Sequence, residues 1–356
     1  ADWRLGVNKN AGASPSVQET AALMVSKMPP AEAEKVIQRV AGIKISRSTL
    51  DREARRQGKR AQDKRDQMDN QLENLEGYRE VGQRAQAQLS ERPFTMVIEI
   101  DAWNIRERDQ WGQTEQLRRS GEDPKRWHWV YTGTCFRLDQ RVKKESGRSM
   151  ILSRGYVATR EGIDSLSRQI RAEAVRQGLG QAQKVLVIAD GAIWIWNMVK
   201  DRFAGATQRL DYYHASEHLW EVARELHGRG SAEARKWIKP LLKQLKNGQS
   251  LKVIQKLEDL EKVVEGKTKE KVESEREYFE NNKDRLGYDV GKELGEPIGS
   301  GAIEATCRQY QCRFKRPGQF WSRTGDEALL TLETFWRNER WQLLFPHSHR
   351  HNPGRN

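Results

Sequence analysis

Three acidic residues occupy positions at which carboxylates could bind divalent cations. Asp101 ends an alternating apolar run, Asp190 ends a continuous apolar run, and Glu304 opens a helix after a glycine-rich turn. Catalytic groups of open α/β sheets collect at the carboxyl ends of strands, so we expect these acids to converge. Converging carboxylates repel one another unless cations neutralise them, and two Mg²⁺ ions about 4 Å apart would do so. The set predicts a two-metal site, although each acid alone is equally typical of a solvated or helix-capping side chain.

A basic and aromatic segment follows Glu304. It contains five basic side chains and no acidic one, which suits a polyanion held beside a cation site. The basic residues are Arg308, Arg313, Lys315, Arg316 and Arg323. We expect them to hold phosphates, whereas Trp321 could stack on an unpaired base or simply pack in the interior. The alternative is an ordinary solvated helix whose N-terminal Glu favours the helix dipole.

The charge of the whole chain also indicates a polyanionic partner. The chain has 356 residues and a formal net charge of +13, which makes nucleic acid the first partner to consider. Three cysteines are too few for a disulfide framework, so we expect a reducing, cytoplasmic location, associated with the nucleoid. We expect no membrane segment, because no apolar run reaches membrane-spanning length. The chain begins with Ala1 rather than Met and is consistent with a fragment.

Residues 1–61 are predicted to form a helix-turn-helix DNA-binding domain. Ser16 with Glu19 suggests one capping box and Ser48 with Asp51 suggests another cap, and Gly42 suits a helix C-terminus between them. Two helices, a turn and a basic third helix match a motif that reads the major groove, although a plain three-helix bundle has the same outline. The basic residues expected to contact DNA are Arg52, Arg55, Arg56, Lys59 and Arg60.

The rest of the chain predicts an α/β fold with a mixed sheet, flanking helices and an all-helical insertion. We expect a linker helix over residues 62–92, a first part of the core over 93–219, the insertion over 220–294, a second part over 295–346 and a flexible tail over 347–356. Asn104 to Arg126 is expected to be a loop, Met150 to Thr159 a strand and Gln208 to Tyr213 a fifth strand. Residues 185–189 predict a central parallel strand, because their apolarity is continuous.

Four segments of the sequence resemble a known protein family. The resemblance is carried by IADGAIWIWN (188–197), LDYYHASEHLW (210–220), GSGAIEATCRQYQCRFKRPGQFWS (299–322) and WRNERWQLLFP (336–346). These segments resemble bacterial insertion-sequence DDE transposases of the ISKra group, which are related to Mutator-type transposases. The resemblance covers roughly residues 94–346. It implies an RNase H-like core and Mg²⁺-dependent DNA cleavage and strand transfer, with Asp101, Asp190 and Glu304 as the metal-binding triad and Mn²⁺ as a substitute ion.

Asp211 and His214 are accessory candidates. Related Mutator-type enzymes carry a Cys or Asp followed by x-x-His shortly after the second acid, and Asp211-Tyr212-Tyr213-His214 matches that form. Asp211 is therefore the alternative to Asp190 as second metal ligand. Asp190 is preferred because a buried strand gives it a rigid platform. His214 and His218 could also be one helical face that packs on the sheet, since a zinc pair would need a third ligand.

The sequence thus predicts a transposase that binds the ends of an insertion sequence and a target DNA as a homodimer or larger assembly. Two other classes stay open. One is a domesticated, catalytically silent DNA-binding protein, and the other is an RNase H-like nuclease or resolvase.

Overall fold

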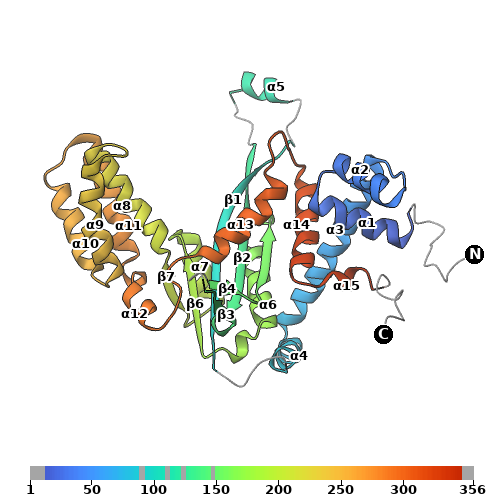
Figure 1. Cartoon of the computed structure of the whole chain (residues 1–356), viewed down its shortest axis with the longest axis horizontal. Helices are drawn as coiled ribbons and strands as arrows, with labels where there is room; N and C mark the ends of the chain where they lie inside the picture. Colours follow the sequence, from blue (N-terminus) through green and yellow to red (C-terminus); the bar gives the residue numbers. More distant parts are fainter. Residues whose placement is uncertain (1–12, 88–92, 109–112, 122–125, 146–148, 347–356) are drawn as a thin grey trace, which may run out of the picture.

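The computed structural model describes residues 13–87, 93–108, 113–121, 126–145 and 149–346, without the side chains of Thr114, Lys143 and Arg323. The centre of the fold is a five-stranded mixed sheet in the order β5-β2-β1-β6-β7 (Figure 1). β1 is antiparallel to β2 and parallel to β6, β2 is antiparallel to β5, and β6 is parallel to β7. The strands are β1 (Thr95–Arg106), β2 (Trp127–Arg137), β5 (Gly155–Thr159), β6 (Lys184–Ala189) and β7 (Thr207–Leu210).

Helices cover both faces of this sheet, because side chains of successive strand residues point to opposite faces. Ile98 and Ile100 of β1 belong to a core that includes α6 (Ile163–Arg176) and α7 (Ile193–Arg202). Trp103 and Ile105 belong to a second core with α13 (Gly301–Phe314) and α14 (Arg323–Arg337). The continuous apolar run of β6 is buried from Leu186 onward, which confirms the predicted central parallel strand.

The N-terminal helices share the second core. α1 (Pro15–Lys27), α2 (Pro30–Ala41) and α3 (Arg47–Asn70) bury their apolar residues with those of α13 and α14. α3 runs unbroken through the expected division at residue 61. Figure 1 shows these helices in blue at one end of the molecule.

Two predicted helix starts are wrong by two residues each. The caps are Ser14 and Ser46, whose hydroxyls accept hydrogen bonds from Val17 N and Thr49 N. α1 begins before Ser16 because Pro15 has the φ of a first helical residue already fixed. Gly42 ends α2 at a φ of 67°, as predicted.

The bounds of the strands differ from the prediction where pairing with a distant strand decides how far a strand extends. β1 runs on beyond Asp101 to Arg106, because β2 continues to pair with it after β6 has ended. The predicted loop from Asn104 therefore begins inside a strand, and it also contains the short helix α5 (Thr114–Arg119) at the top of Figure 1. The expected strand from Met150 is split into β5 and β4 (Ser149–Ile151), and β4 pairs with β3 (Arg141–Lys143).

The all-helical insertion lies at the opposite end of the molecule from the N-terminal helices (Figure 1). It begins earlier than expected, because β7 ends at Leu210 and Asp211 caps the next helix. Its helices are α8 (Tyr212–His227), α9 (Ala232–Lys246), α10 (Ser250–Glu261), α11 (Gly266–Asn281) and α12 (Tyr288–Glu293). The remaining helices are α4 (Leu75–Gln86) and α15 (Trp341–Leu344). None of the helices in the described ranges is long and apolar enough to span a bilayer.

Candidate carboxylate site

Asp101 and Asp190 lie beside each other at the point where β6 ends. The parallel pairing of β1 with β6 reaches Glu99 opposite Ile188, and both chains advance two residues from there to the two aspartates. Asp101 is half-buried, and its position is inside β1 rather than at the predicted strand end. Burial raises the pKa of the Asp101 carboxyl above its ordinary value, and the neighbouring Asp190 carboxylate raises it further. Within the described residues neither acid forms an ion pair with Lys or Arg, so their repulsion favours a bound cation.

α13 crosses β1 and places Glu304 between two contacts with that strand. The backbone N–H of Ile303 donates to Glu99 Oε2 at 2.8 Å, and Cys307 Sγ lies 3.6 Å from Asp101 Oδ2. Glu304 is half-exposed, and among the described residues its side chain forms one hydrogen bond, a 3.4 Å contact with the Arg308 guanidinium. α13 therefore carries the third acid across the strand that contains Asp101.

Glu99 is a buried acid that the sequence analysis missed. Its side chain is 1% exposed. Burial raises the pKa of Glu99 to about 8 despite the hydrogen bond from Ile303 N, and Asp211 raises it as well. Glu99 is two residues before Asp101 and so lies on the same face of β1, which is the signal that could have found it. It joins the sheet to the start of the Glu304 helix.

Both carboxylate oxygens of Asp211 accept hydrogen bonds from backbone N–H groups, at the start of α8 and at Ser300. Oδ1 accepts from Tyr213 N at 2.5 Å and from His214 N at 3.2 Å, which caps α8. Oδ2 accepts from Ser300 N at 2.6 Å and from the Ser300 hydroxyl. Asp211 is completely buried, so its contacts fit a structural role, whereas Asp190 is only half-buried.

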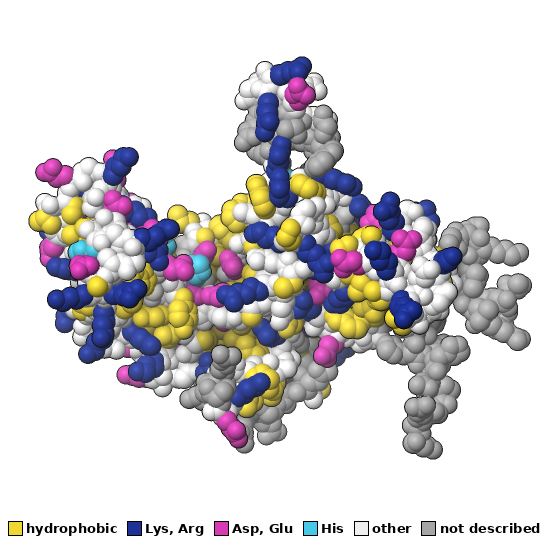
Figure 2. All heavy atoms as spheres, turned by 45° about the horizontal axis from the view of Figure 1, so that its top comes forward, with side chains coloured by type: hydrophobic (Ala, Val, Ile, Leu, Met, Phe, Trp, Pro, Cys, Tyr) yellow, Lys and Arg dark blue, Asp and Glu magenta, His cyan; other side chains and the backbone are white. Residues whose placement is uncertain are grey.

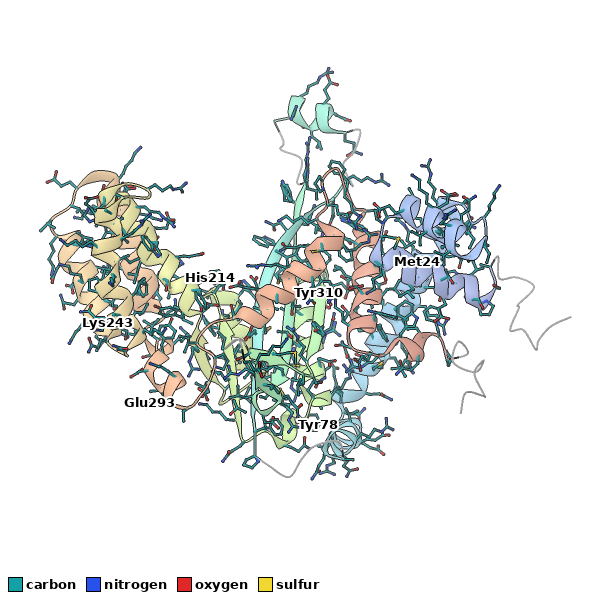
Figure 3. All side chains as sticks on the ribbon, in the orientation of Figure 1. Met24, Tyr78, His214, Lys243, Glu293 and Tyr310 are labelled. Atoms are coloured by element: carbon teal, nitrogen blue, oxygen red, sulfur yellow. The ribbon has the colours of Figure 1, made fainter. Side chains whose placement is uncertain are left out.

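The two histidines of the motif have different surroundings. His214 lies at the sheet end of α8, as Figure 3 shows, and it interacts electrostatically with Asp101. His218 instead stacks on Tyr278 of α11, with ring centroids 3.6 Å apart, and its Nδ1 lies 2.5 Å from Glu275 Oε2. His214 therefore belongs to the acidic junction, and His218 belongs to the packing of the insertion.

The turn after Asp190 is fixed from two sides. Asp190 Oδ1 accepts from Ala192 N at 3.0 Å, and the Tyr278 hydroxyl donates to the Asp190 carbonyl oxygen at 2.7 Å. Gly191 has a φ of 100°, and a Cβ there would lie 2.8 Å from Leu210 Cδ1 and 3.0 Å from Tyr278 Cε2. Only glycine fits this turn, so the Asp-Gly pair is explained by close packing against α11.

The basic segment after Glu304 is only partly on the surface. The Arg308 side chain is exposed, Lys315 is exposed near the Trp127 ring, and Arg316 pairs with Glu32 at 3.0 Å. The prediction for Arg313 is wrong, because this side chain is buried and donates to the Val25 carbonyl from Nε and Nη2. Burial lowers the pKa of Arg313 to about 10.

Trp321 is also buried, which supports the second of its two predicted roles, packing in the interior, and not base stacking. Its indole N–H donates to the Phe314 carbonyl at 2.8 Å, and its ring packs against the Phe314 ring. The side chain of Arg323 lies outside the described part of the structure. Of the segment's predicted contact residues, Arg308 and Lys315 have side chains most available to a phosphate.

The five residues of α3 that were predicted to contact DNA are exposed, with one exception. Arg55 is half-buried and donates to Asp51 and to Ser322 Oγ at 2.8 Å. The exposed side chains are Arg52, Arg56, Lys59 and Arg60. Figure 2 shows Lys and Arg side chains spread widely over one face, with Asp, Glu and His side chains gathered between the insertion and the centre of the molecule.

The donor set suits a hard divalent cation, because Asp101, Asp190 and Glu304 offer carboxylate oxygens and the two aspartates repel each other. The side chains are not closed around one point: in the described ranges, no three His, Cys, Asp or Glu residues are grouped as a metal site. The chain matches no protein-family model and no curated protein.

Proposed function

We propose that this protein is a DNA transposase with an RNase H-like core that cleaves and joins DNA strands with divalent metal. The observation that carries the proposal is the junction of Asp101 with Asp190 under the helix that bears Glu304. The order of elements supports it too. The elements follow one another in the order that the family resemblance implies. The chain has a strand with the first acid, a central strand followed by Asp-Gly, a helical insertion and then a Glu-bearing helix.

Asp101, Asp190 and Glu304 would hold Mg²⁺ or Mn²⁺. When bound, two such ions supply Lewis-acid stabilisation of the attacking and leaving oxygens of a phosphodiester. The chain itself contributes position and charge. Cys307 and Ile303 keep α13 against β1, and the exposed Arg308 offers a guanidinium to a phosphate one helical turn from Glu304.

DNA is the partner that the surface supports. The exposed cations of α3 and α13 lie on helices that share one core, so a duplex held by α3 would be fixed relative to the carboxylates. Pairing of two transposon ends would need a homodimer or larger assembly. We place the activity in the cytoplasm, at the nucleoid.

The test is a cleavage and strand-joining assay on DNA that spans the native flanks of the gene, with Mg²⁺ or Mn²⁺. We expect Asp190→Asn and Glu304→Gln to bind DNA but lose both reactions, and Asp201→Asn, an exposed acid of α7, to behave as wild type. Asp211→Asn should lower thermal stability while the remaining folded protein stays active.

Each alternative has its own outcome in this assay. DNA binding without any metal-dependent cleavage by the wild type would support a catalytically silent DNA-binding protein, a reading favoured by the open arrangement of the three acids. Cleavage without joining would indicate a nuclease or resolvase. Loss of activity in Asp211→Asn with unchanged stability would make Asp211 the second ligand.

A further inference from the structure

Tyr278 of α11 connects the helical insertion to the backbone of the candidate site. Its hydroxyl donates to the carbonyl oxygen of Asp190, and its ring closes over Gly191 so tightly that a Cβ there would lie 3.0 Å from the ring. No other described side chain donates a hydrogen bond to that carbonyl. The backbone that aims the Asp190 carboxylate is thus held by a residue 88 positions further along the chain.

Tyr278 is itself fixed inside the insertion. Its ring stacks on His218 of α8 at 3.6 Å and 19° between planes, and it meets Phe279 edge-on. His218 is anchored by Glu275, one turn before Tyr278 on α11, and Glu275 also accepts from Lys271 at 2.7 Å. The phenol is therefore located by two helices of the insertion rather than by the sheet.

We propose that Tyr278 is a positioning residue through which the insertion sets the orientation of Asp190. This inference rests on the proposed function, because it assigns Tyr278 a part in holding the metal-binding carboxylate. β6 ends at Ala189, so the Asp190–Gly191 peptide lies beyond the strand, where Gly191 packs between Leu210 of β7 and Tyr278 of the insertion. A partner or DNA duplex that displaced α11 would move the Asp190 backbone with it.

The matched control is Tyr288 of α12, a second buried tyrosine of the same insertion, whose ring packs edge-on against Tyr212 of α8. Its hydroxyl is buried and has no hydrogen-bond partner among the described residues. Tyr278→Phe and Tyr288→Phe both delete one phenolic oxygen and keep the ring. Only the first breaks a contact with Asp190.

The experiment compares wild type, Tyr278→Phe, Tyr288→Phe and Asp190→Asn in three measurements. These are Mn²⁺ binding by electron paramagnetic resonance, kcat and KM for metal-dependent DNA cleavage, and Tm. We expect Tyr278→Phe to weaken Mn²⁺ binding and lower kcat by about 10- to 100-fold, which is the usual effect of removing an outer-sphere contact, with KM for DNA unchanged. Tyr288→Phe should match wild type in metal binding and kcat.

Two results would overturn the inference in distinguishable ways. If wild type is active and Asp190→Asn is not, but Tyr278→Phe changes only Tm, then Tyr278 is merely structural and the proposed function stands. If wild type neither binds Mn²⁺ through Asp190 nor cleaves DNA, both proposals fail together.

Discussion

Arg308 and Arg313 occupy the same helix and carry the same charge, yet their surroundings assign them to different tasks. Arg308 projects into solvent beside Glu304, whereas Arg313 is buried and holds the Val25 carbonyl of α1. A guanidinium with buried donors contributes to packing between elements, and only a solvated one can neutralise a phosphate.

This difference gives a prediction for DNA binding. Arg308→Ala should reduce the slope of log K against log salt by about one, because one phosphate contact and its counterions are lost. Arg313→Ala should leave the slope unchanged and lower Tm, since it leaves the Val25 carbonyl without its donor. Fluorescence anisotropy at several salt concentrations and thermal melts check both variants. Equal slopes for Arg308→Ala and wild type would contradict the assignment.

At the scale of elements, α3 and α14 approach each other closely at one glycine. A Cβ on Gly58 would lie 2.6 Å from Ala328 Cβ and 2.7 Å from the Ala328 carbonyl oxygen. Helix propensity favours alanine over glycine by about 1 kcal/mol, so the local preference and the packing oppose each other here.

Gly58→Ala is expected to destabilise the fold, because backbone contacts at this distance cannot be relieved by a side-chain rotation. Gly82→Ala on α4 is the control, since its Cβ would meet only the end of Gln181 at 3.8 Å and should raise stability slightly. Chemical denaturation of both variants tests the pair. A stabilised Gly58→Ala would show that α3 is not seated on α14 as described.

Sequence patterns predicted the elements that depend on local signals. The apolar run of residues 185–189 and the helix from Gly301 follow from periodicity and glycine placement alone. The extent of β1 could not be predicted in this way, because pairing with β2 decides it. The cap at Ser46 was missed because Ser48, two residues later, also fits a capping pattern.

Within the candidate site, the neighbouring positions of Asp101 and Asp190 could be expected from the strand pattern, whereas the environment of the surrounding residues could not. Arg313 falls on the stripe of α13 that contains Tyr310 and Phe314, so its helical spacing was a signal for the core that the prediction of a phosphate contact overlooked. Tyr278 could not have been found in this way. Its contact with Asp190 joins residues 88 positions apart, and nothing local to residue 278 marks it.

At the scale of the whole molecule, one pH-dependent contribution to stability lies where α3, α14 and β5 meet. Glu327 of α14 accepts from Arg65 of α3 at 2.6 Å and from Thr159 of β5 at 3.1 Å. Burial raises the pKa of Glu327 to about 6, even though Arg65 opposes the shift. The unfolded chain takes up this proton only near pH 4.5, the ordinary value for glutamate.

The sign of the effect follows from linkage. Because the folded carboxyl binds its proton more tightly, this group contributes stability below about pH 4.5 that is lost as pH rises through about 6. The free energy of unfolding lost over this range is about 2 kcal/mol, because the pKa of Glu327 rises from 4.5 to about 6 on folding. Glu327→Gln should remove that part of the profile, so its stability relative to wild type should rise across the window in melts at pH 5 to 7. Parallel profiles would contradict the raised pKa.

The continuity of α3 has a consequence for where such an enzyme would cut. Its N-terminal half bears exposed cations, and farther along Arg65 and Asp69 bond to residues that cover the sheet. Twenty-four helical residues make a rigid rod of about 36 Å. The DNA-binding cations and the carboxylates would then be held at a fixed distance from each other by one helix. A few base pairs inserted between the recognised sequence and the scissile bond should therefore move the cut to a new bond, at the old distance from the recognised sequence.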